Sequence, residues 1–101
     1  MDIALIKLTM KSAEDDLAVV INKFLDLKTF TTRDVCWWWN PSKCWLTNYQ
    51  QVQNVIRILT NEKCLMAVHY SWNFRITPRF RKILLEMLDD LEDLDDLEDN
   101  N

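Results

Sequence analysis

An amphipathic helix followed at once by a hairpin, within residues 46–78, constrains the fold of this chain more than any other feature. Thr47 predicts the helix N-cap, and no helix breaker interrupts residues 48–59. At about 100° per residue, the apolar residues collect on one side of this helix. They are Tyr49, Val52, Ile56 and Leu59, with Val55 at the edge. We expect this side to be buried.

The opposite side of the helix carries amides and a guanidinium but no carboxylate. Its residues are Gln50, Asn54 and Arg57, flanked by Thr47 and Gln51. Amides and guanidinium groups pair bidentately with adenine and guanine edges in a major groove, whereas phosphate repels a carboxylate. The pattern indicates either a face that reads nucleic acid or an ordinary solvated helix face.

Two short segments rich in aliphatic and aromatic residues follow, at 65–70 and 73–76, and predict two strands. Ser71 and Trp72 are left as a tight connection between them. Trp72 either reaches a groove or backbone of a ligand, or packs as a turn residue, and we favour packing. A group of cations then follows with no acid before Glu86: Arg75, Arg79, Arg81 and Lys82.

Helix, hairpin and basic run in this order resemble the winged helix-turn-helix family. In many of its members the recognition helix leads into a wing that closes on Tyr/Phe-Arg-Leu/Ile-Thr-Pro, as Phe74-Arg75-Ile76-Thr77-Pro78 does here. The resemblance spans roughly residues 13–88. It implies a mostly helical α+β fold with a three-helix core, a two-stranded wing and a C-terminal helix. The implied DNA contacts are bases for Gln50, Gln51, Asn54 and Arg57, a phosphate for Thr47, and the DNA backbone for Arg75, Arg79, Arg81 and Lys82.

Upstream segments fit the same order of elements with two departures. Ser12, with Asp15 three residues on, predicts a helix N-cap and a helix to about Leu27. Residues 30–35, which include Thr31 and Thr32, resemble the start of the family's first helix, where a threonine cap precedes a short helix. An apolar insertion at residues 36–45 then replaces the family's short polar turn. The chain has no glycine, so Asn61 or Lys63 must supply the turn after the recognition helix.

The chain divides by pattern into three parts: residues 1–11, 12–88 and 89–101. Residues 6–10 alternate well enough to predict an N-terminal strand or arm, which would pair with the wing or with a second copy of the chain. Residues 12–88 are the expected winged-helix domain. Residues 89–101 form an acidic C-terminal tail.

The formal charge of −4 conceals two oppositely charged segments. Residues 1–85 hold twelve basic and seven acidic side chains, hence +5, while residues 86–101 hold nine acids and no base. Leucines recur every third residue from 85 to 97, a spacing that drifts around an α-helix. The tail is either frayed and solvated, a dimerisation helix, or a phosphate mimic that covers the basic face or engages a basic partner. The dimerisation residues would be Leu84, Met87, Leu88 and Leu91.

Three consecutive tryptophans cannot all point inward, because successive side chains diverge in a helix or a strand. We expect two of Trp37, Trp38 and Trp39, together with Trp45, to complete a small core. The alternative is a protein contact, since tryptophan is enriched at binding hot spots. Stacking of this cluster on unpaired bases is disfavoured, because no basic residue interleaves the rings.

Cysteine and histidine usage does not indicate a metal site. Cys36, Cys44 and Cys64 lack Cys-x-x-Cys spacing and occur with one histidine, His69. We expect buried, reduced thiols. No cofactor and no enzymatic activity are expected, because no nucleophile, base and orienting group fall into a recognisable pattern.

Two functions from different classes follow from these patterns. The first is a small, dimeric winged-helix regulator of transcription, of viral or mobile-element type, that binds double-stranded DNA. The second is a winged-helix protein-interaction module or inhibitor that engages a partner, such as a polymerase or nuclease component, through the tryptophans and the acidic tail. An intracellular location is expected, with no membrane association, because no apolar run reaches about 18 residues and the N-terminus lacks a secretory pattern.

Overall fold

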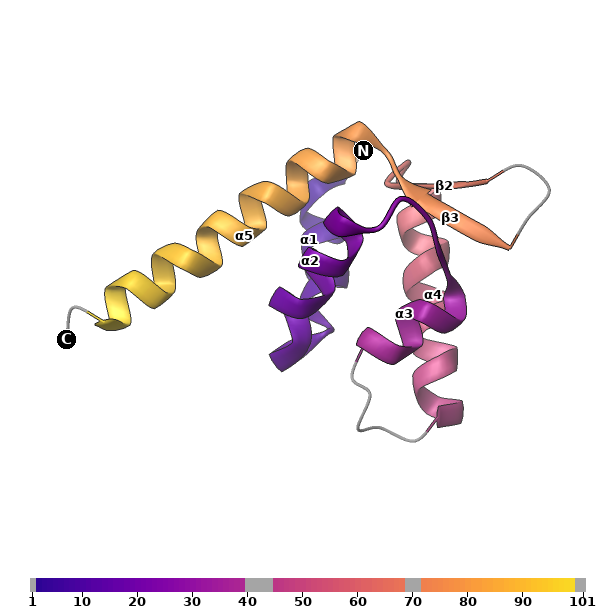
Figure 1. Ribbon diagram of the computed structural model, residues 1–101, viewed down its shortest axis with the longest axis horizontal. Helices are drawn as coiled ribbons and strands as arrows, with labels where there is room; N and C mark the ends of the chain where they lie inside the picture. Colours follow the sequence, from indigo (N-terminus) through magenta and orange to yellow (C-terminus); the bar gives the residue numbers. More distant parts are fainter. Residues whose placement is uncertain (1, 40–44, 69–71, 100–101) are drawn as a thin grey trace.

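The computed structural model describes residues 2–39, 45–68 and 72–99, which form a mostly helical α+β fold with a three-stranded antiparallel sheet (Figure 1). Along the chain the elements are α1 (Ile3–Lys11), the short 3₁₀ helix η1 (Glu14–Asp16), α2 (Leu17–Asp26), β1 (Phe30–Thr31), α3 (Thr32–Trp38), α4 (Trp45–Asn61), β2 (Leu65–Ala67), β3 (Asn73–Ile76) and α5 (Pro78–Asp99). Within this described part, no helix is both long and apolar enough to span a bilayer.

The N-terminal segment is a helix, so the predicted strand over residues 6–10 is wrong. Asp2 caps α1, its carboxylate accepting a hydrogen bond of 3.0 Å from the Leu5 backbone N–H. Ile6 and Met10 are fully buried, whereas Leu8 between them is 68% exposed. A spacing of four residues places Ile6 and Met10 on one helix face, while strand alternation would have placed Leu8 beside them.

The second helix begins later than the sequence predicted. Ser12 ends α1 instead of capping the next helix, and its hydroxyl donates to the Thr9 carbonyl at 2.6 Å. The chain then turns through Glu14, whose φ is 54°, and η1 precedes α2. The predicted end near Leu27 agrees with α2, which ends at Asp26.

The threonine cap expected within residues 30–35 is confirmed, and the capping residue is Thr31. Its hydroxyl accepts a hydrogen bond from the Asp34 backbone N–H at 3.1 Å, and the Asp34 carboxylate accepts one from the Thr31 N–H at 2.9 Å. This reciprocal capping box satisfies two N–H groups that a helix start leaves open. Phe30 and Thr31 also pair with β3, so the hairpin is part of a sheet with the strand order β1-β3-β2.

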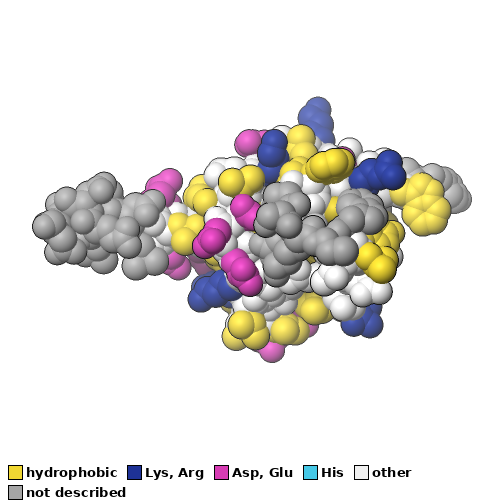
Figure 2. Space-filling view, turned by 90° about the horizontal axis from the view of Figure 1, so that it is seen from below, with side chains coloured by type: hydrophobic (Ala, Val, Ile, Leu, Met, Phe, Trp, Pro, Cys, Tyr) yellow, Lys and Arg dark blue, Asp and Glu magenta, His cyan; other side chains and the backbone are white. Residues whose placement is uncertain are grey.

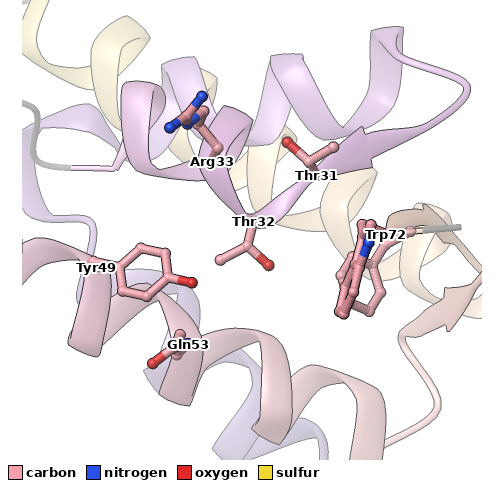
Figure 3. Close-up of a pocket in the computed structure, with 7 residues that line it drawn as sticks. Thr31, Thr32, Arg33, Tyr49, Gln53 and Trp72 are labelled. Carbon is pink, nitrogen blue, oxygen red and sulfur yellow. The ribbon is translucent and has the colours of Figure 1, made fainter.

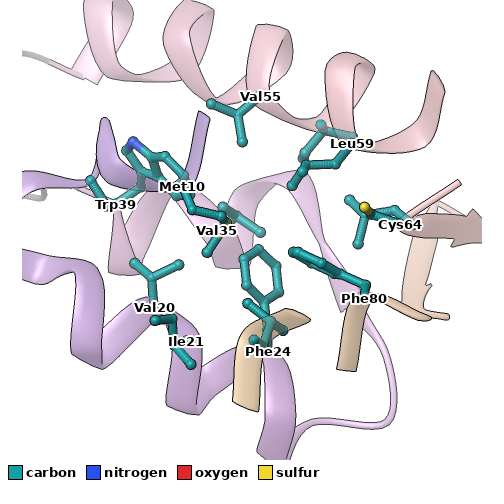
Figure 4. Close-up of a cluster of buried hydrophobic side chains, with 14 of the residues drawn as sticks. Met10, Val20, Ile21, Phe24, Val35, Trp39, Val55, Leu59, Cys64 and Phe80 are labelled. Carbon is teal, nitrogen blue, oxygen red and sulfur yellow. The ribbon is translucent and has the colours of Figure 1, made fainter. Parts of the chain in front are cut away.

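Large side chains from the helices and from β1 converge on one core (Figure 4). Phe24 lies at its centre, with ring centroids 5.0 Å from Phe30 and 5.7 Å from both Trp38 and Phe80. The consecutive tryptophans diverge as expected, since Trp39 is fully buried, Trp38 half-buried and Trp37 69% exposed. Trp39 therefore belongs to the core, and its assignment as a partner-contact residue is wrong. Trp45 was also expected to help fill the core, and its side chain lies outside the described part.

The last helix continues the chain directly from the hairpin. Thr77 caps it, its hydroxyl accepting a hydrogen bond from the Phe80 N–H at 3.3 Å, and Pro78 occupies the first helical position, where a missing N–H costs nothing. Leu84 is fully buried, so it is not available to a dimer partner, and Leu88 and Leu91 pack in part against the same core. The helix extends to Asp99, and its C-terminal end projects past α1 and α2 (Figure 1).

Candidate functional site

Helix α4 packs against α1, α3 and β2 through the apolar side that its periodicity predicted. Val52, Val55, Ile56 and Leu59 are buried, and Tyr49 is half-buried. Asn48 is also buried, and its side-chain amide donates to the Cys36 carbonyl of α3 at 3.0 Å, which ties the first turns of α4 to the end of α3. The two helices therefore form a fixed pair.

The polar side of α4 faces solvent. Thr47, Gln50, Asn54 and Arg57 are exposed, as the periodicity predicted, and Gln51 is half-buried. The Arg57 guanidinium donates to the Asn54 side-chain oxygen at 3.1 Å, so the two side chains are held as a pair. Because α4 begins at Trp45, Thr47 lies within the first turn, and its predicted role as N-cap is wrong.

Of the two residues expected to make the turn after α4, Asn61 and Lys63, it is Lys63 that adopts the left-handed conformation. Lys63 has a φ of 63°, and its N–H donates to the Thr60 carbonyl at 3.1 Å, while the Cys64 N–H donates to the Leu59 carbonyl at 2.8 Å. These two hydrogen bonds form a Schellman motif, which satisfies carbonyls at the helix end. The hairpin therefore leaves α4 in a fixed direction.

A groove runs between α4, the start of α3 and the hairpin. It consists of two adjoining hollows of about 560 and 320 Å³, which share Thr32, Gln53 and Phe74. The larger is also lined by Thr31, Arg33, Tyr49 and Trp72, and the smaller by Ile56, Arg57, Thr60 and Asn61. In Figure 3, Tyr49 and Gln53 lie on the α4 side and Trp72 lies across from them. Among described residues, the lining of this α4 groove includes arginine but no Asp or Glu.

Sequence analysis did not assign three of the groove residues to the site: Trp72, Gln53 and Arg33. Trp72 is 91% exposed, so the packed interpretation is wrong. Gln53 is exposed on the rim between the amide face and the apolar side, where helical periodicity alone is ambiguous. Arg33 reaches the groove because β1 joins the hairpin, and that long-range pairing leaves no local signal in the sequence.

The cations after the hairpin differ in their exposure and contacts. Arg75 is exposed on β3, where its guanidinium contacts the Met66 sulfur at 3.3 Å across the β2–β3 pair. Arg79 is half-buried with its Nε inaccessible to solvent, and Arg81 donates to the Leu25 carbonyl of α2 at 3.4 Å. Lys82 is exposed. The predicted grouping of all four beside the recognition helix stays a prediction, since Arg81 is exposed as well and only Arg79 is half-buried.

Both described thiols, Cys36 and Cys64, are free and buried. Burial raises the pKa of Cys36, and it raises the pKa of Cys64 to about 11, against the opposing effect of the nearby Arg79 cation. Such neutral thiols are poor nucleophiles and poor metal ligands. Within the part of the chain that is described, no three His, Cys, Asp or Glu side chains gather as metal ligands; Cys44 and His69 lie outside it.

Charge is distributed unevenly over the surface. In the view of Figure 2, Asp and Glu side chains gather in the left half, whereas toward the hairpin the charged side chains are mainly Lys and Arg. The exposed acids of α5 include Glu86, Asp89, Asp90 and Glu92. The acidic helix end and the α4 groove therefore lie at different ends of the molecule.

Comparisons with protein-family models, with curated proteins and with solved structures gave no match to this chain.

Proposed function

We propose that this protein is a small winged-helix DNA-binding regulator, in which α3 and α4 act as the helix-turn-helix and the β2–β3 hairpin acts as the wing. The order α2, β1, α3, α4, β2, β3 supports this proposal, as does the pairing of β1 with the hairpin. The observation that carries it is the exposed polar side of α4, which holds amides and a guanidinium beside an antiparallel hairpin.

Each group on this side of α4 has a chemical role in the proposal. Gln50 and Asn54 offer paired amide donors and acceptors to adenine, and Arg57 offers two parallel donors to guanine. An α-helix of ordinary diameter fits a major groove about 12 Å wide. Arg75 on the hairpin and Arg33 on α3 are both exposed, and they would contact phosphates. Arg79 is half-buried and Arg81 donates to the Leu25 carbonyl, so both are left out of the binding set.

Fluorescence-anisotropy titration with a pool of labelled mixed-sequence duplexes at low salt tests the proposal. The full chain should bind, and raising the salt should weaken binding steeply, because contacts to phosphate release counterions. Absence of binding to duplex DNA at low salt contradicts the proposal. Selection from the pool then supplies the preferred sequence for the variants described below.

A chain ending at Glu92 separates the DNA-binding surface from the acidic end of α5. It retains Leu91, which packs against the core, and removes most of the nine C-terminal acids. If the acids only repel DNA from a distance, this chain should bind several-fold more tightly at low salt and equally at high salt. Circular dichroism should show the same unfolding midpoint for both chains.

One observation favours a second candidate function, a protein-interaction module. Trp37 and Leu46 are 69% and 64% exposed near the junction of α3 and α4, where large apolar side chains in contact with water are suited to a protein partner. Affinity capture with the full chain, the Trp37→Ala variant and the chain ending at Glu92 tests it. A partner retained equally by all three forms counts against this candidate.

A further inference from the structure

Among the described residues, the most exposed large hydrophobic side chain is the tryptophan at the hairpin. Trp72 is 91% exposed, compared with 69% for Trp37 and complete burial for Trp39. Its backbone is anchored on one side, because Asn73 begins β3 and its carbonyl accepts a hydrogen bond from the Val68 N–H at 2.8 Å. The sheet thus presents a large aromatic ring to solvent at a defined place.

The ring lies beside a hollow whose other walls suit a flat, partly polar ligand. Tyr49 and Phe74 contribute two further aromatic side chains, and Thr32 and Gln53 contribute hydrogen-bonding groups (Figure 3). The hollow measures about 560 Å³, within the range of about 300–1,000 Å³ in which small organic groups bind. Aromatic walls with an amide and hydroxyls are typical of sites that hold a heterocyclic ring.

The charge of the side chains that line the groove favours an anionic ligand. Arg33 lines the larger hollow and Arg57 the adjoining one, and no described lining residue of either is acidic. A nucleotide meets all these conditions, since its base has two aromatic faces and hydrogen-bonding edges, and its phosphate is anionic. Stacking of bases on aromatic side chains beside a basic groove is the usual mode of binding single strands.

A base inside a duplex cannot stack on Trp72, because its neighbours cover both of its faces. We therefore infer that the α4 groove holds an unpaired nucleotide of a DNA strand, with the base against Trp72 and the phosphate near Arg33. This inference rests on the proposed function, and it specifies the DNA as a duplex that continues into a single strand. The paired part would lie on α4 and the unpaired part beside the hairpin.

Anisotropy titration with matched DNAs tests the inference. One is a blunt duplex, and the other carries the same duplex with an unpaired tail of about eight nucleotides, within the span that single-strand sites cover. The full chain should bind the tailed DNA more tightly. Trp72→Ala should weaken binding of the tailed DNA by about tenfold and of the blunt duplex by less than about twofold. Trp72→Phe should retain most of the affinity, because a ring still stacks.

Trp37→Ala is the matched control, because Trp37 is also exposed but does not line the groove. It should bind both DNAs as the unchanged protein does. The inference is overturned if Trp72→Ala loses the same affinity for blunt and for tailed DNA. It is also overturned if the unchanged protein binds the two DNAs with equal affinity. If a tail of ribonucleotides is bound as tightly as the DNA tail, the restriction to DNA is overturned.

The outcomes also separate this inference from the proposed function. Binding of the blunt duplex with no gain from the tail leaves the proposed function standing and removes the inference. Binding of the tailed DNA and of a single strand, without binding of the blunt duplex, supports the nucleotide site and contradicts duplex reading by α4. Failure to bind any of these nucleic acids overturns both. Equal thermal unfolding midpoints confirm that each variant is folded.

Discussion

Helices α4 and α5 bury their apolar residues by the same periodicity but present opposite charges to solvent. The outer side of α4 carries Gln50, Asn54 and Arg57, and that of α5 carries Glu86, Asp89 and Asp90 after a basic first turn. Burial follows from the spacing of apolar residues in either helix. The charge of the solvent-exposed side does not depend on burial. The outer side of α4 has no carboxylate among the residues named above, whereas the carboxylates of α5 would repel a polyanion.

Substitution of a buried leucine of α5 should change stability the most, and it tests whether α5 is packed into the core as firmly as α4. Leu84 is fully buried, and its neighbour Leu85 is 48% exposed. Leu84→Ala should lower the free energy of unfolding by about 2–5 kcal/mol, because it removes contacts and leaves a cavity. Leu85→Ala should change it by less than about 0.5 kcal/mol. Urea unfolding followed by circular dichroism measures both, and similar values for the two would show that α5 is not packed as described.

The charge contrast between the helices is tested on DNA binding. Arg57→Gln on α4 should reduce discrimination between the preferred duplex and one changed at a single guanine by about 1–3 kcal/mol, because it removes two parallel donors. Glu86→Gln on α5 is the control. It should leave discrimination unchanged and raise the affinity for all duplexes slightly. A loss of affinity without loss of discrimination in Arg57→Gln would mean that Arg57 contacts only phosphate.

The hydroxyl of Thr77 connects the start of α5 to the turn that ends α4, and its removal should lower stability. Thr77 caps α5 and also donates to the Lys63 carbonyl at 2.8 Å, at the turn that ends α4. Thr77→Ala should lower the free energy of unfolding by about 1 kcal/mol. Thr77→Ser keeps the hydroxyl and should lose less. If both variants lose the same amount in chemical denaturation, the cap is not the cause.

The smallest expected effect has the opposite sign. Lys63 adopts a left-handed conformation with a φ of 63°, which a side chain with a Cβ disfavours. Lys63→Gly should raise the free energy of unfolding by about 0.5–1 kcal/mol, after the greater flexibility of glycine in the unfolded chain is subtracted. Lys63→Ala retains the Cβ and should not gain stability. A gain in the alanine variant would point to the removed charge as the cause.

Local patterns predicted those parts of the fold that a short segment determines. The buried side of α4, a threonine cap before α3, the hairpin strands and the turn after α4 each depend on residues that are close together in the sequence. The α+β class followed from the same elements. The polar side of α4, which is central to the candidate site, was also predicted, because it is what remains when the apolar stripe is buried.

The predictions that were wrong concern features that depend on contacts between residues far apart in the sequence. Residues 6–10 fit both periods, and only burial of Ile6 and Met10 against the rest of the chain selects the helix. The predicted two-stranded wing gains a third strand because Phe30 pairs with Phe74, forty-four residues along the chain. That same pairing brings Arg33 to the groove, while Arg81 is drawn to Leu25 of α2.

Sequence patterns alone establish which residues of each helix can be buried together, and they establish the opposite charges of the body and the C-terminal segment. Tertiary structure decided which of the three tryptophans filled the core, left Trp72 exposed, and chose which arginines border the groove. The physical reason is that periodicity and capping act over a few residues. A groove, by contrast, forms where elements far apart in the chain meet, and its lining depends on how they pack.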